Sequence, residues 1–201
     1  MARSFAQMAR SAEQSSRTVQ VPKEPPSEAP MAIRTLGDAV LRTPAKRISK
    51  VDESVRELAR DMLRSMYAAK GIGLAAPQVG VHKQLLVIDL EPDNAATPPL
   101  VLINPEIRAF GPGLETYEEG CLSIPGVYLD VVRPTTVDVT YRDELGRPQR
   151  RRTDGLLARC IQHEMDHLNG VLFVDRVTDE LSLNAELQEH GFQRGDVQSI
   201  R

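Results

Sequence analysis

The chain has 201 residues, 41% hydrophobic and 26% charged, which is enough for one globular domain with a sizeable core. Its formal net charge of −3 excludes a general attraction to nucleic acids, and an aromatic content of 4% argues against base-stacking surfaces. Two cysteines are too few for a disulfide-stapled secreted fold, and no apolar run reaches the roughly 18–20 residues of a transmembrane helix.

Residues 1–30 differ in composition from the rest of the chain. They are rich in Ser, Gln, Arg and Pro and show little apolar periodicity, so we predict a flexible N-terminal extension that contributes little to the core. No apolar stretch typical of a secretory signal is present. An organelle transit peptide is the alternative, because Arg3, Arg10 and Arg17 stand among serines with Glu13 as the one acid.

The folded part of the chain is predicted to begin near Ile33, and a helix is predicted over residues 52–70. Apolar residues recur there at helical spacing, namely Val55, Leu58, Ala59, Met62, Met66 and Ala69. Gly71 is expected to end this helix at the left-handed position that follows the last turn. Residues 71–78 are too rich in Gly and Pro for a helix interior.

Strands dominate the middle of the chain, and one further helix follows them. Strands are predicted at residues 85–90, 100–103, 127–132 and 136–141, and a turn at 143–146 leads into a strand at 147–152. A second long helix is predicted from residue 154 to 170, then a short strand at 171–174 and a polar tail with a short helix within 178–188. This order indicates an α+β fold, with antiparallel or mixed sheets packed around a central helix.

The strongest local signal is an HExxH pattern inside the second predicted helix. His163 and His167 lie one turn apart on the same face, so both imidazoles can bind one metal ion. Glu164 lies about 100° further round, where it can reach a water beside the ion. Leu156 and Cys160 share the histidine stripe, which indicates that the histidines point toward the core.

A hydrolytic metal site needs a third protein ligand and one open position. The candidates are His82, His190, Cys121, Cys160, Glu180 and Glu186. Cys160 has the position of a small apolar wall residue on the helix. Cys121 follows a glycine and precedes Pro125, which is typical of an irregular strand end where a thiolate could face an ion, although a single cysteine is more often buried filler.

Three segments together resemble the signature motifs of the peptide deformylase family. They are residues 71–78, 119–123 and 162–167, in the family's order and spacing, and the resemblance runs from Met31 to Asp175. It implies a metal-dependent hydrolase that removes the formyl group from the N-terminal formylmethionine of newly synthesised polypeptides. Formate would be released by attack of a metal-activated water. Residues 31–177 would then form the catalytic domain and 178–201 a short polar C-terminal tail.

The resemblance also implies roles for individual residues. The metal ligands would be Cys121, His163 and His167, with Glu164 as general base and then general acid. Gln78 and the backbone N–H of Leu122 would bind the oxyanion. One divalent ion per chain is expected, Fe²⁺ by resemblance, with Zn²⁺, Ni²⁺ or Co²⁺ as alternatives that the same ligands accept.

The substrate and the support of the site follow from the same resemblance. Ile72 and Gly73 would pair with the substrate backbone like a strand. The methionine side chain would lie among Tyr117, Gly120, Leu156 and Cys160, for which core packing is the other interpretation. Glu119, Arg133 and Asp166 occupy family positions of a charged network that orients the ligands. A surface ion pair worth under about 1 kcal/mol is the alternative for that network.

Some features depart from the family pattern. Tyr128 stands where many bacterial relatives carry an Arg that faces the substrate, so side-chain preference beyond methionine is open. The tail lacks the long helix that some relatives use on ribosomes, and the basic run at 147–152 is interpreted as an exposed strand face that could approach ribosomal RNA. We expect a monomer in the bacterial cytoplasm that meets formylmethionyl peptides and contacts ribosomes transiently, without sequence-specific nucleic-acid binding or membrane association. A plastid or mitochondrion is the alternative location.

Two other functions use the same residues. A zinc peptidase would take a downstream carboxylate as third ligand, so changing Cys121 to Ala would leave its metal content intact. A non-catalytic metal- or peptide-binding homologue would need neither Glu164 nor Gln78. Release of formate from a formylmethionyl dipeptide distinguishes both from a deformylase.

Overall fold

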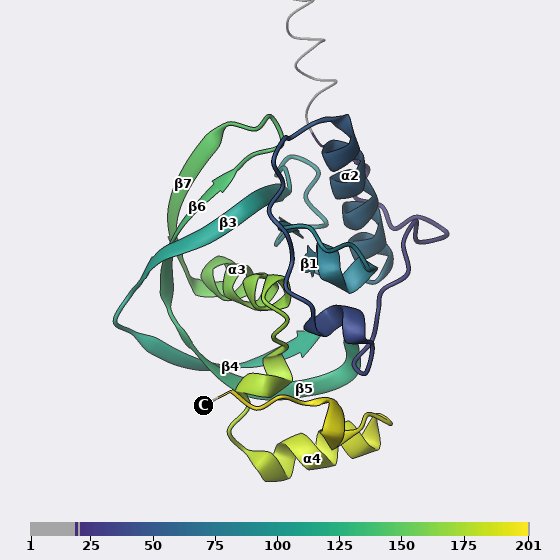
Figure 1. Cartoon of the computed structure of the whole chain (residues 1–201), viewed down its shortest axis with the longest axis vertical. Helices are drawn as coiled ribbons and strands as arrows, with labels where there is room; N and C mark the ends of the chain where they lie inside the picture. The colour runs from purple at the N-terminus through teal and green to yellow at the C-terminus, as the bar shows by residue number, and fades with distance from the viewer. Residues whose placement is uncertain (1–18, 20, 201) are drawn as a thin grey trace, which may run out of the picture.

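The computed structural model describes residue 19 and residues 21–200, whose strands form two sheets around a central helix (Figure 1). The larger sheet has the order β1 (Gly73–Ala75), β2 (Leu85–Ile88), β3 (Leu100–Phe110), β6 (Thr136–Arg142) and β7 (Pro148–Asp154). The smaller sheet pairs β4 (Leu114–Cys121) with β5 (Ile124–Pro134). Every neighbouring pair is antiparallel. Helix α3 (Gly155–Leu168) lies between the two sheets, which confirms the predicted α+β class.

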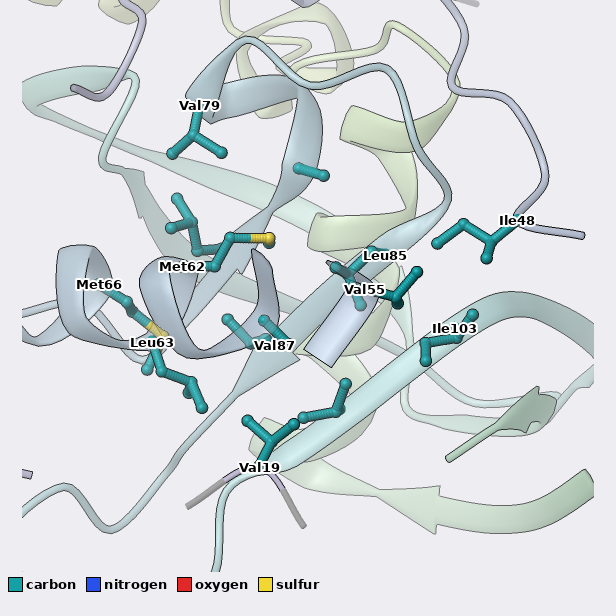
Figure 2. Close-up of a cluster of buried hydrophobic side chains, with 14 of the residues drawn as sticks. Val19, Ile48, Val55, Met62, Leu63, Met66, Val79, Leu85, Val87 and Ile103 are labelled. Atoms are coloured by element: carbon teal, nitrogen blue, oxygen red, sulfur yellow. The ribbon is translucent and has the colours of Figure 1, made fainter. Parts of the chain in front are cut away.

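Helix α2 (Glu53–Ala68) covers the first strands of the larger sheet and closes one hydrophobic core. Asp52 caps its N-terminus by accepting a hydrogen bond from the backbone N–H of Val55. Its buried face includes Met62, Leu63 and Met66, which pack against β2 and β3 in the cluster of Figure 2. Each such fully buried side chain contributes about 1.5–3 kcal/mol, which fixes α2 on the sheet.

The C-terminal end of α2 corrects the prediction for Gly71. Lys70, with φ 56°, takes the left-handed position that the sequence pattern assigns to Gly71. The backbone N–H of Lys70 donates to the carbonyl of Tyr67 and that of Gly71 to Met66, which is a Schellman motif shifted by one residue. Glycine is needed at 71 for another reason, because a Cβ there would lie 2.6 Å from a methyl carbon of Leu122.

Several element boundaries differ from the sequence prediction. The predicted strand at 171–174 is wrong, because that segment leads into the 3₁₀ helix η3 (Phe173–Arg176). Its apolar run is explained by burial, since Leu172, Phe173 and Val174 all lie in a second core cluster under β5. Strand β4 was not predicted, because most of its residues are exposed and show no apolar alternation.

The central helix α3 is unusual because it buries polar side chains along most of its length. Its apolar residues Ala158, Ile161 and Leu168 pack in a third cluster against the larger sheet. Its buried polar residues are Arg159, Gln162, His163, Glu164, Asp166 and His167. Burial of ionisable groups is costly unless they are paired or bind a metal, so this helix is where the chemistry is expected.

The terminal segments contribute to the cores more than the composition predicts. Val19 is buried in the first cluster, so the expectation that residues 1–30 contribute little to the core is wrong at this position. The predicted short helix in the tail is α4 (Glu180–Glu189), which buries Leu183 and Leu187 against the second cluster. The candidate transit peptide, residues 1–17, lies outside the described residues. No helix in the described part of the chain is long and apolar enough to span a bilayer.

The remaining 3₁₀ helices connect these elements. They are η1 (Ala39–Arg42), η2 (Ala76–Val79) and η4 (Arg194–Asp196). η2 follows β1 directly and carries Gln78 into the interior, where its side chain is buried. The predicted borders at residues 30 and 177 stay predictions.

Candidate metal centre and active site

A sulfur and two imidazoles converge where the end of β4 meets α3. The candidate ligand atoms of Cys121, His163 and His167 all lie within 4.8 Å of one another. The thiol sulfur of Cys121 lies 3.3 Å from Nε2 of His167. The two histidine rings lie one turn apart on α3, with centroids 5.2 Å apart. This is the only such group of metal-binding side chains within residues 19 and 21–200.

A hydrogen bond and burial leave Nε2 of each imidazole available for a metal ion. Nδ1 of His163 lies 2.9 Å from a carboxylate oxygen of Glu119, which leaves Nε2 for a ligand. Nδ1 of His167 is buried without a hydrogen-bond partner among the described atoms. Burial lowers the pKa of His167 well below its ordinary value, and the nearby His163 acts in the same direction. The neutral imidazole that this favours is the form that binds a metal.

Glu164 lies in the same pocket with one unsatisfied oxygen. Its side chain is buried, and Oε2 has no hydrogen-bond partner in the part of the chain that the structure describes. Burial raises the pKa of Glu164 to about 7. A buried carboxyl group that titrates near neutrality and faces an open cleft can accept and return a proton.

Gln78 and the Cys121 turn form a second set of donors beside the metal ligands. The side-chain oxygen of Gln78 accepts a hydrogen bond from the backbone N–H of Ala75, at 2.8 Å. Its amide nitrogen is therefore directed to the other side, 3.1 Å from the hydroxyl of Ser123 and 3.5 Å from the sulfur of Cys121. The backbone N–H of Leu122, in the turn between β4 and β5, has no backbone partner among the described residues.

A cleft of about 630 Å³ opens onto these groups. Its lining comes from residues 69–73, from residues 117–122 and 124–128, and from α3, which we call the two walls and the floor. Tyr117, Tyr128 and Leu156 are about half exposed at its mouth, whereas Cys160 is buried in its floor. All the residues expected to contact substrate line this cleft, namely Ile72, Gly73, Tyr117, Gly120, Leu156 and Cys160.

Glycine at position 73 is required by close contacts with α3. A Cβ on Gly73 would lie 2.4 Å from a carboxylate oxygen of Glu164 and 2.8 Å from the sulfur of Cys160. Gly120 has a similar constraint, since its Cβ would lie 2.5 Å from the ring of Tyr128. Glycines therefore allow the two walls and the floor of the cleft to approach one another.

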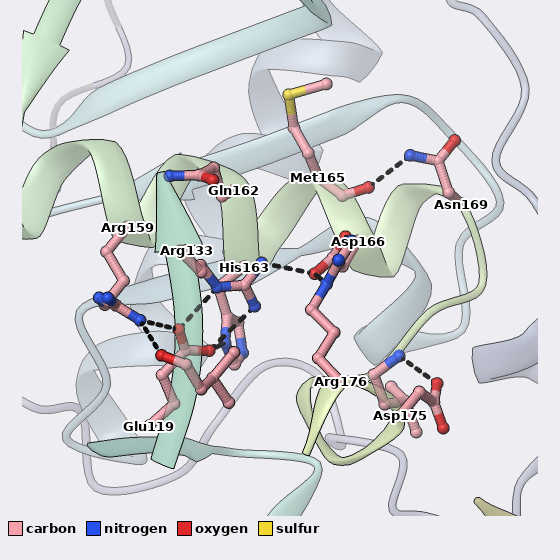
Figure 3. Close-up of polar contacts among 12 residues, drawn as sticks. Glu119, Arg133, Arg159, Gln162, His163, Met165, Asp166, Asn169, Asp175 and Arg176 are labelled. Carbon is pink, nitrogen blue, oxygen red and sulfur yellow. Dashed lines mark hydrogen bonds and ion pairs between the residues drawn. The ribbon is translucent and has the colours of Figure 1, made fainter. Parts of the chain in front are cut away.

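A buried charge network joins the β4–β5 sheet to α3 behind the ligands (Figure 3). Arg133 on β5 donates to both oxygens of Glu119, at 2.6 and 2.9 Å, and to Asp166 at 2.8 Å. Burial disfavours ionisation of Glu119, but hydrogen bonds from His163 and Arg133 outweigh it and hold the pKa of Glu119 well below its usual range. The carboxylate that supports His163 is therefore charged at neutral pH.

The sequence did not identify every member of this network. Arg159 on α3 donates to Glu119 at 2.7 Å, and its guanidinium lies 5.5 Å from the centroid of the Tyr117 ring. Arg176 donates to Asp166 at 2.6 Å. Ser123, which contacts Gln78, was also not identified. Arg159 could have been noticed, because it stands one helical turn before His163 on a face that the pattern predicts to be buried.

The other candidates for a third ligand do not join the group. Glu180 and Glu186 lie on α4, which packs against β5. His190 follows α4, where its ring lies against Gly126. His82 precedes β2, and its backbone carbonyl accepts a hydrogen bond from Lys46. Cys160 lies in the cleft floor, but the metal-binding group among the described residues contains only Cys121 and the two histidines.

Comparisons with known proteins agree with this geometry. The family model described as polypeptide deformylase matches residues 30–182. A peptide deformylase of Synechococcus sp. strain CC9605 is 70% identical over 200 residues, and one of strain RCC307 is 72% identical over 201, each alignment covering 100% of both chains. The crystal structure of a peptide deformylase from Synechococcus elongatus in complex with actinonin is 59% identical. It covers 90% of this chain and 98% of that chain, with a TM-score of 0.89.

Proposed function

Because the chain belongs to the peptide deformylase family, we propose that Cys121, His163 and His167 hold its metal ion and that Glu164 moves the proton. The activity itself is the metal-dependent hydrolysis that removes the formyl group from nascent polypeptides. The observation that carries the residue assignment is the convergence of the three ligand atoms within 4.8 Å, beside a buried carboxylate with a free oxygen.

The donor set fits a divalent transition metal. One thiolate and two imidazoles suit Fe²⁺, Zn²⁺, Ni²⁺ and Co²⁺, and Fe²⁺ is proposed from the family resemblance. When bound, such an ion supplies Lewis acidity, which lowers the pKa of a water toward neutrality and polarises the formyl oxygen. The support for a resident ion is the convergence of three metal-binding atoms within 4.8 Å of one another, a set that suits one ion with an open coordination position.

Glu164 is proposed to serve as general base and then as general acid. It accepts a proton from the water as the water oxygen attacks the formyl carbon. It then gives that proton to the amine nitrogen as the carbon–nitrogen bond breaks, which leaves formate and a free amino terminus. A pKa of about 7, raised by burial, matches both directions of transfer near neutral pH.

Gln78 and Leu122 are proposed to stabilise the negative charge that develops on the formyl oxygen. The Gln78 amide is locked by Ala75 so that its nitrogen faces the Cys121 turn. The backbone N–H of Leu122 lies in that same turn. One oxyanion donor of this type is worth about 3–4 kcal/mol in the transition state.

The cleft walls are proposed to hold the substrate as an extended chain. The backbone of Ile72 and Gly73 would pair with the peptide, while Tyr117, Gly120, Leu156 and Cys160 enclose the methionine side chain. Behind them, Glu119, Arg133 and Asp166 are proposed to keep His163 oriented and to hold β4 against α3.

We also propose that the chain works as a monomer in the bacterial cytoplasm. All of the proposed ligands, donors and walls come from a single chain, so no second copy is needed to complete the site. The cytoplasm is supported by the cyanobacterial relatives and by the nascent chains that serve as substrate. Contact with ribosomes is proposed to be transient.

Formate release from a formylmethionyl peptide by Fe²⁺- or Ni²⁺-loaded protein tests the residue assignment. Glu164→Gln should lose about 10²- to 10⁴-fold in kcat because the proton carrier is removed, while metal content stays at one ion per chain. The exposed Glu189→Gln serves as the matched control and should keep full activity. Retention of kcat in Glu164→Gln would exclude this residue as the base.

A further inference from the structure

We propose that Lys23 is a positioning residue for the reaction. Through Asp89, it holds Ile72 in the cleft wall that is proposed to pair with the substrate backbone. Lys23 lies in the N-terminal segment, before residue 30, where the family match begins. Alignments with the Synechococcus relatives nevertheless cover the whole chain, so these relatives have a segment that aligns with the one that contains Lys23. The inference rests on the proposed pairing of Ile72 with the substrate.

The ammonium group of Lys23 forms an ion pair with Asp89 just beyond the end of β2. Nζ lies 2.7 Å from Oδ2 of Asp89, and the carboxylate is 1% exposed. The hydroxyl of Tyr67 donates to the same oxygen at 2.7 Å, and the backbone N–H of Glu91 donates to Oδ1 at 3.0 Å. A buried carboxylate needs a compensating charge, and Lys23 supplies it.

Asp89 is connected directly to the cleft wall. Its backbone N–H donates to the carbonyl of Ile72 at 2.9 Å, one residue beyond the ladder that pairs Gly73 with Ile88. Ile72 is 37% exposed and lines the cleft. The position of Asp89 therefore sets where the backbone of Ile72 stands relative to a bound peptide.

Residues 72–73 cannot shift far without changing their contacts with Glu164 and Cys160 on α3. Gly73, the next residue, lies so close to Glu164 and Cys160 that a Cβ would overlap both. The carbonyl of Ile72 also lies 4.0 Å from the sulfur of Cys160. A small movement of residues 72–73 would thus change the spacing between the substrate backbone and the floor of the cleft.

The N-terminal segment is itself fixed on both sides of Lys23. Val19 is buried in the first core cluster and Val21 packs against it. After Lys23, the backbone N–H of Met31 donates to the hydroxyl of Ser65 on α2 at 3.0 Å. Nζ of Lys23 also donates to the carbonyl of Glu91, at 2.8 Å. Because the backbone on both sides is fixed, the ammonium group of Lys23 is held in position beside Asp89.

A positioning role and a merely stabilising ion pair differ in their kinetics. A stabilising pair would change the denaturation midpoint and leave KM unaltered. Misplacement of Ile72 would weaken the backbone hydrogen bonds to the peptide, and one such bond corresponds to about three- to tenfold in affinity. The proton transfer by Glu164 would keep its kcat.

The experiment measures kcat and KM of metal-loaded full-length protein on two substrates. One is a formylmethionyl tripeptide, and the other carries an N-methyl group on the amide that follows methionine. Lys23→Met should raise KM for the first peptide about three- to tenfold with kcat within twofold, and Lys23→Arg should restore most of the loss. The exposed Lys50→Met is the control and should match the wild type.

A double variant separates position from stability. Lys23→Met leaves the buried Asp89 carboxylate without a counter-charge and lowers the denaturation midpoint, whereas Lys23→Met with Asp89→Asn removes that charge and recovers the midpoint. The raised KM should persist in the double variant. A KM that stays at the wild-type value in both variants would overturn the inference, whatever the midpoints do.

The N-methyl peptide tests the premise independently. The wild type should show a higher KM for it, and this difference should shrink in Lys23→Met because the pairing is already weakened. If N-methylation leaves the wild-type KM unchanged, the strand-like pairing proposed for Ile72 fails, and the role of Lys23 fails with it. If N-methylation raises the wild-type KM but Lys23→Met does not, only the role of Lys23 fails.

Discussion

Cys121 and Cys160 have the same side chain in two different settings. Cys121 lies at the end of β4 with its sulfur 3.3 Å from His167, whereas Cys160 lies in the cleft floor, where burial raises the pKa of its thiol well above the ordinary value. A thiol that resists ionisation is a poor metal ligand. The chemistry of these two residues is therefore decided by what surrounds them.

We predict that Cys121→Ser abolishes stable metal binding and that Cys160→Ser does not. Loss of one of three ligands leaves a site too weak to hold an ion through purification, and formate release falls with it. Elemental analysis of anaerobically purified variants measures the metal content. Full occupancy in Cys121→Ser would mean that another residue completes the site, as in the peptidase alternative.

Gly73→Ala is predicted to lower kcat by about 10- to 100-fold without loss of the metal. The added methyl group would lie 2.4 Å from the carboxylate of Glu164, so the base must move out of line. Gly195→Ala is the matched control, because no atom lies within 4 Å of the position that its methyl group would take. Wild-type kcat in Gly73→Ala would show that Glu164 has room to rearrange.

The two histidine ligands could be predicted from residue spacing, whereas Cys121 could be assigned only through the family resemblance. His163 and His167 follow from helical spacing alone, because that geometry is contained within five residues. Cys121 is 42 positions before His163, and spacing does not say which distant side chain arrives. Ser123 was missed for the same reason, since its partner Gln78 lies on another element. For Arg159, helical spacing indicates a buried position but not its partner Glu119 on β4.

The hairpin between β6 and β7 shows how one residue defines an element. Both oxygens of Asp143 accept hydrogen bonds, from the backbone N–H groups of Leu145 and Arg147 and from the side chains of Arg147 and Gln149. Burial disfavours the charged form, but these donors outweigh it and lower the pKa of Asp143. The turn is thus held by an ionised carboxylate.

Asp143→Asn is predicted to cost about 1–2 kcal/mol of unfolding free energy at pH 7. Because the folded pKa lies below the ordinary value of 3.8, the charge stabilises the fold at neutral pH, and that contribution disappears as the pH falls through the folded pKa. Urea denaturation from pH 7 to pH 3 should show the gap to wild type closing. The exposed Asp93→Asn should show no gap, and a gap in Asp143→Asn that is constant with pH would contradict the prediction.

Helices and strands were predicted correctly where apolar residues recur at a regular period. The prediction failed where strand pairing or complete burial determines the structure. Helices α2 and α3 were found because their stripes repeat at helical spacing. β4 was missed because it exposes most of its side chains and is specified by pairing with β5. Residues 171–174 are all apolar and show no period, so the pattern could not distinguish a strand from the 3₁₀ segment that occurs.

At the scale of the whole molecule, buried ion pairs join segments that are distant in sequence. Lys23 reaches Asp89, Arg133 reaches Glu119 and Asp166, and Arg42 reaches Asp175 across 133 positions. The Arg133 network was predicted from the family resemblance. Residue spacing could not predict the other two pairs, because each arginine or lysine has many acidic residues to choose from. The Lys23 and Arg42 pairs specify how the terminal segments lie on the domain that composition and periodicity do predict.

The Arg42–Asp175 pair holds the C-terminal segment in place. Asp175 is 1% exposed and accepts two hydrogen bonds from Arg42, as well as one each from the backbone N–H groups of Leu172 and Gln198. Arg42 also donates to the carbonyl of Asp196. The pair therefore fastens the residues after α4 to η1 and η3.

Arg42→Met should lower the unfolding free energy by about 3–5 kcal/mol, because it leaves the Asp175 charge buried without its partner. Arg34→Met is the control, since its ion pair with Asp38 is 3.9 Å long and exposed on both sides, and should cost under about 1 kcal/mol. Limited proteolysis should cut Arg42→Met within residues 190–200 at conditions where Arg34→Met stays intact. Equal denaturation midpoints for the two variants would show that the C-terminal segment is held by its apolar contacts, with Leu183, Leu187 and Val197 sufficient to keep it in place.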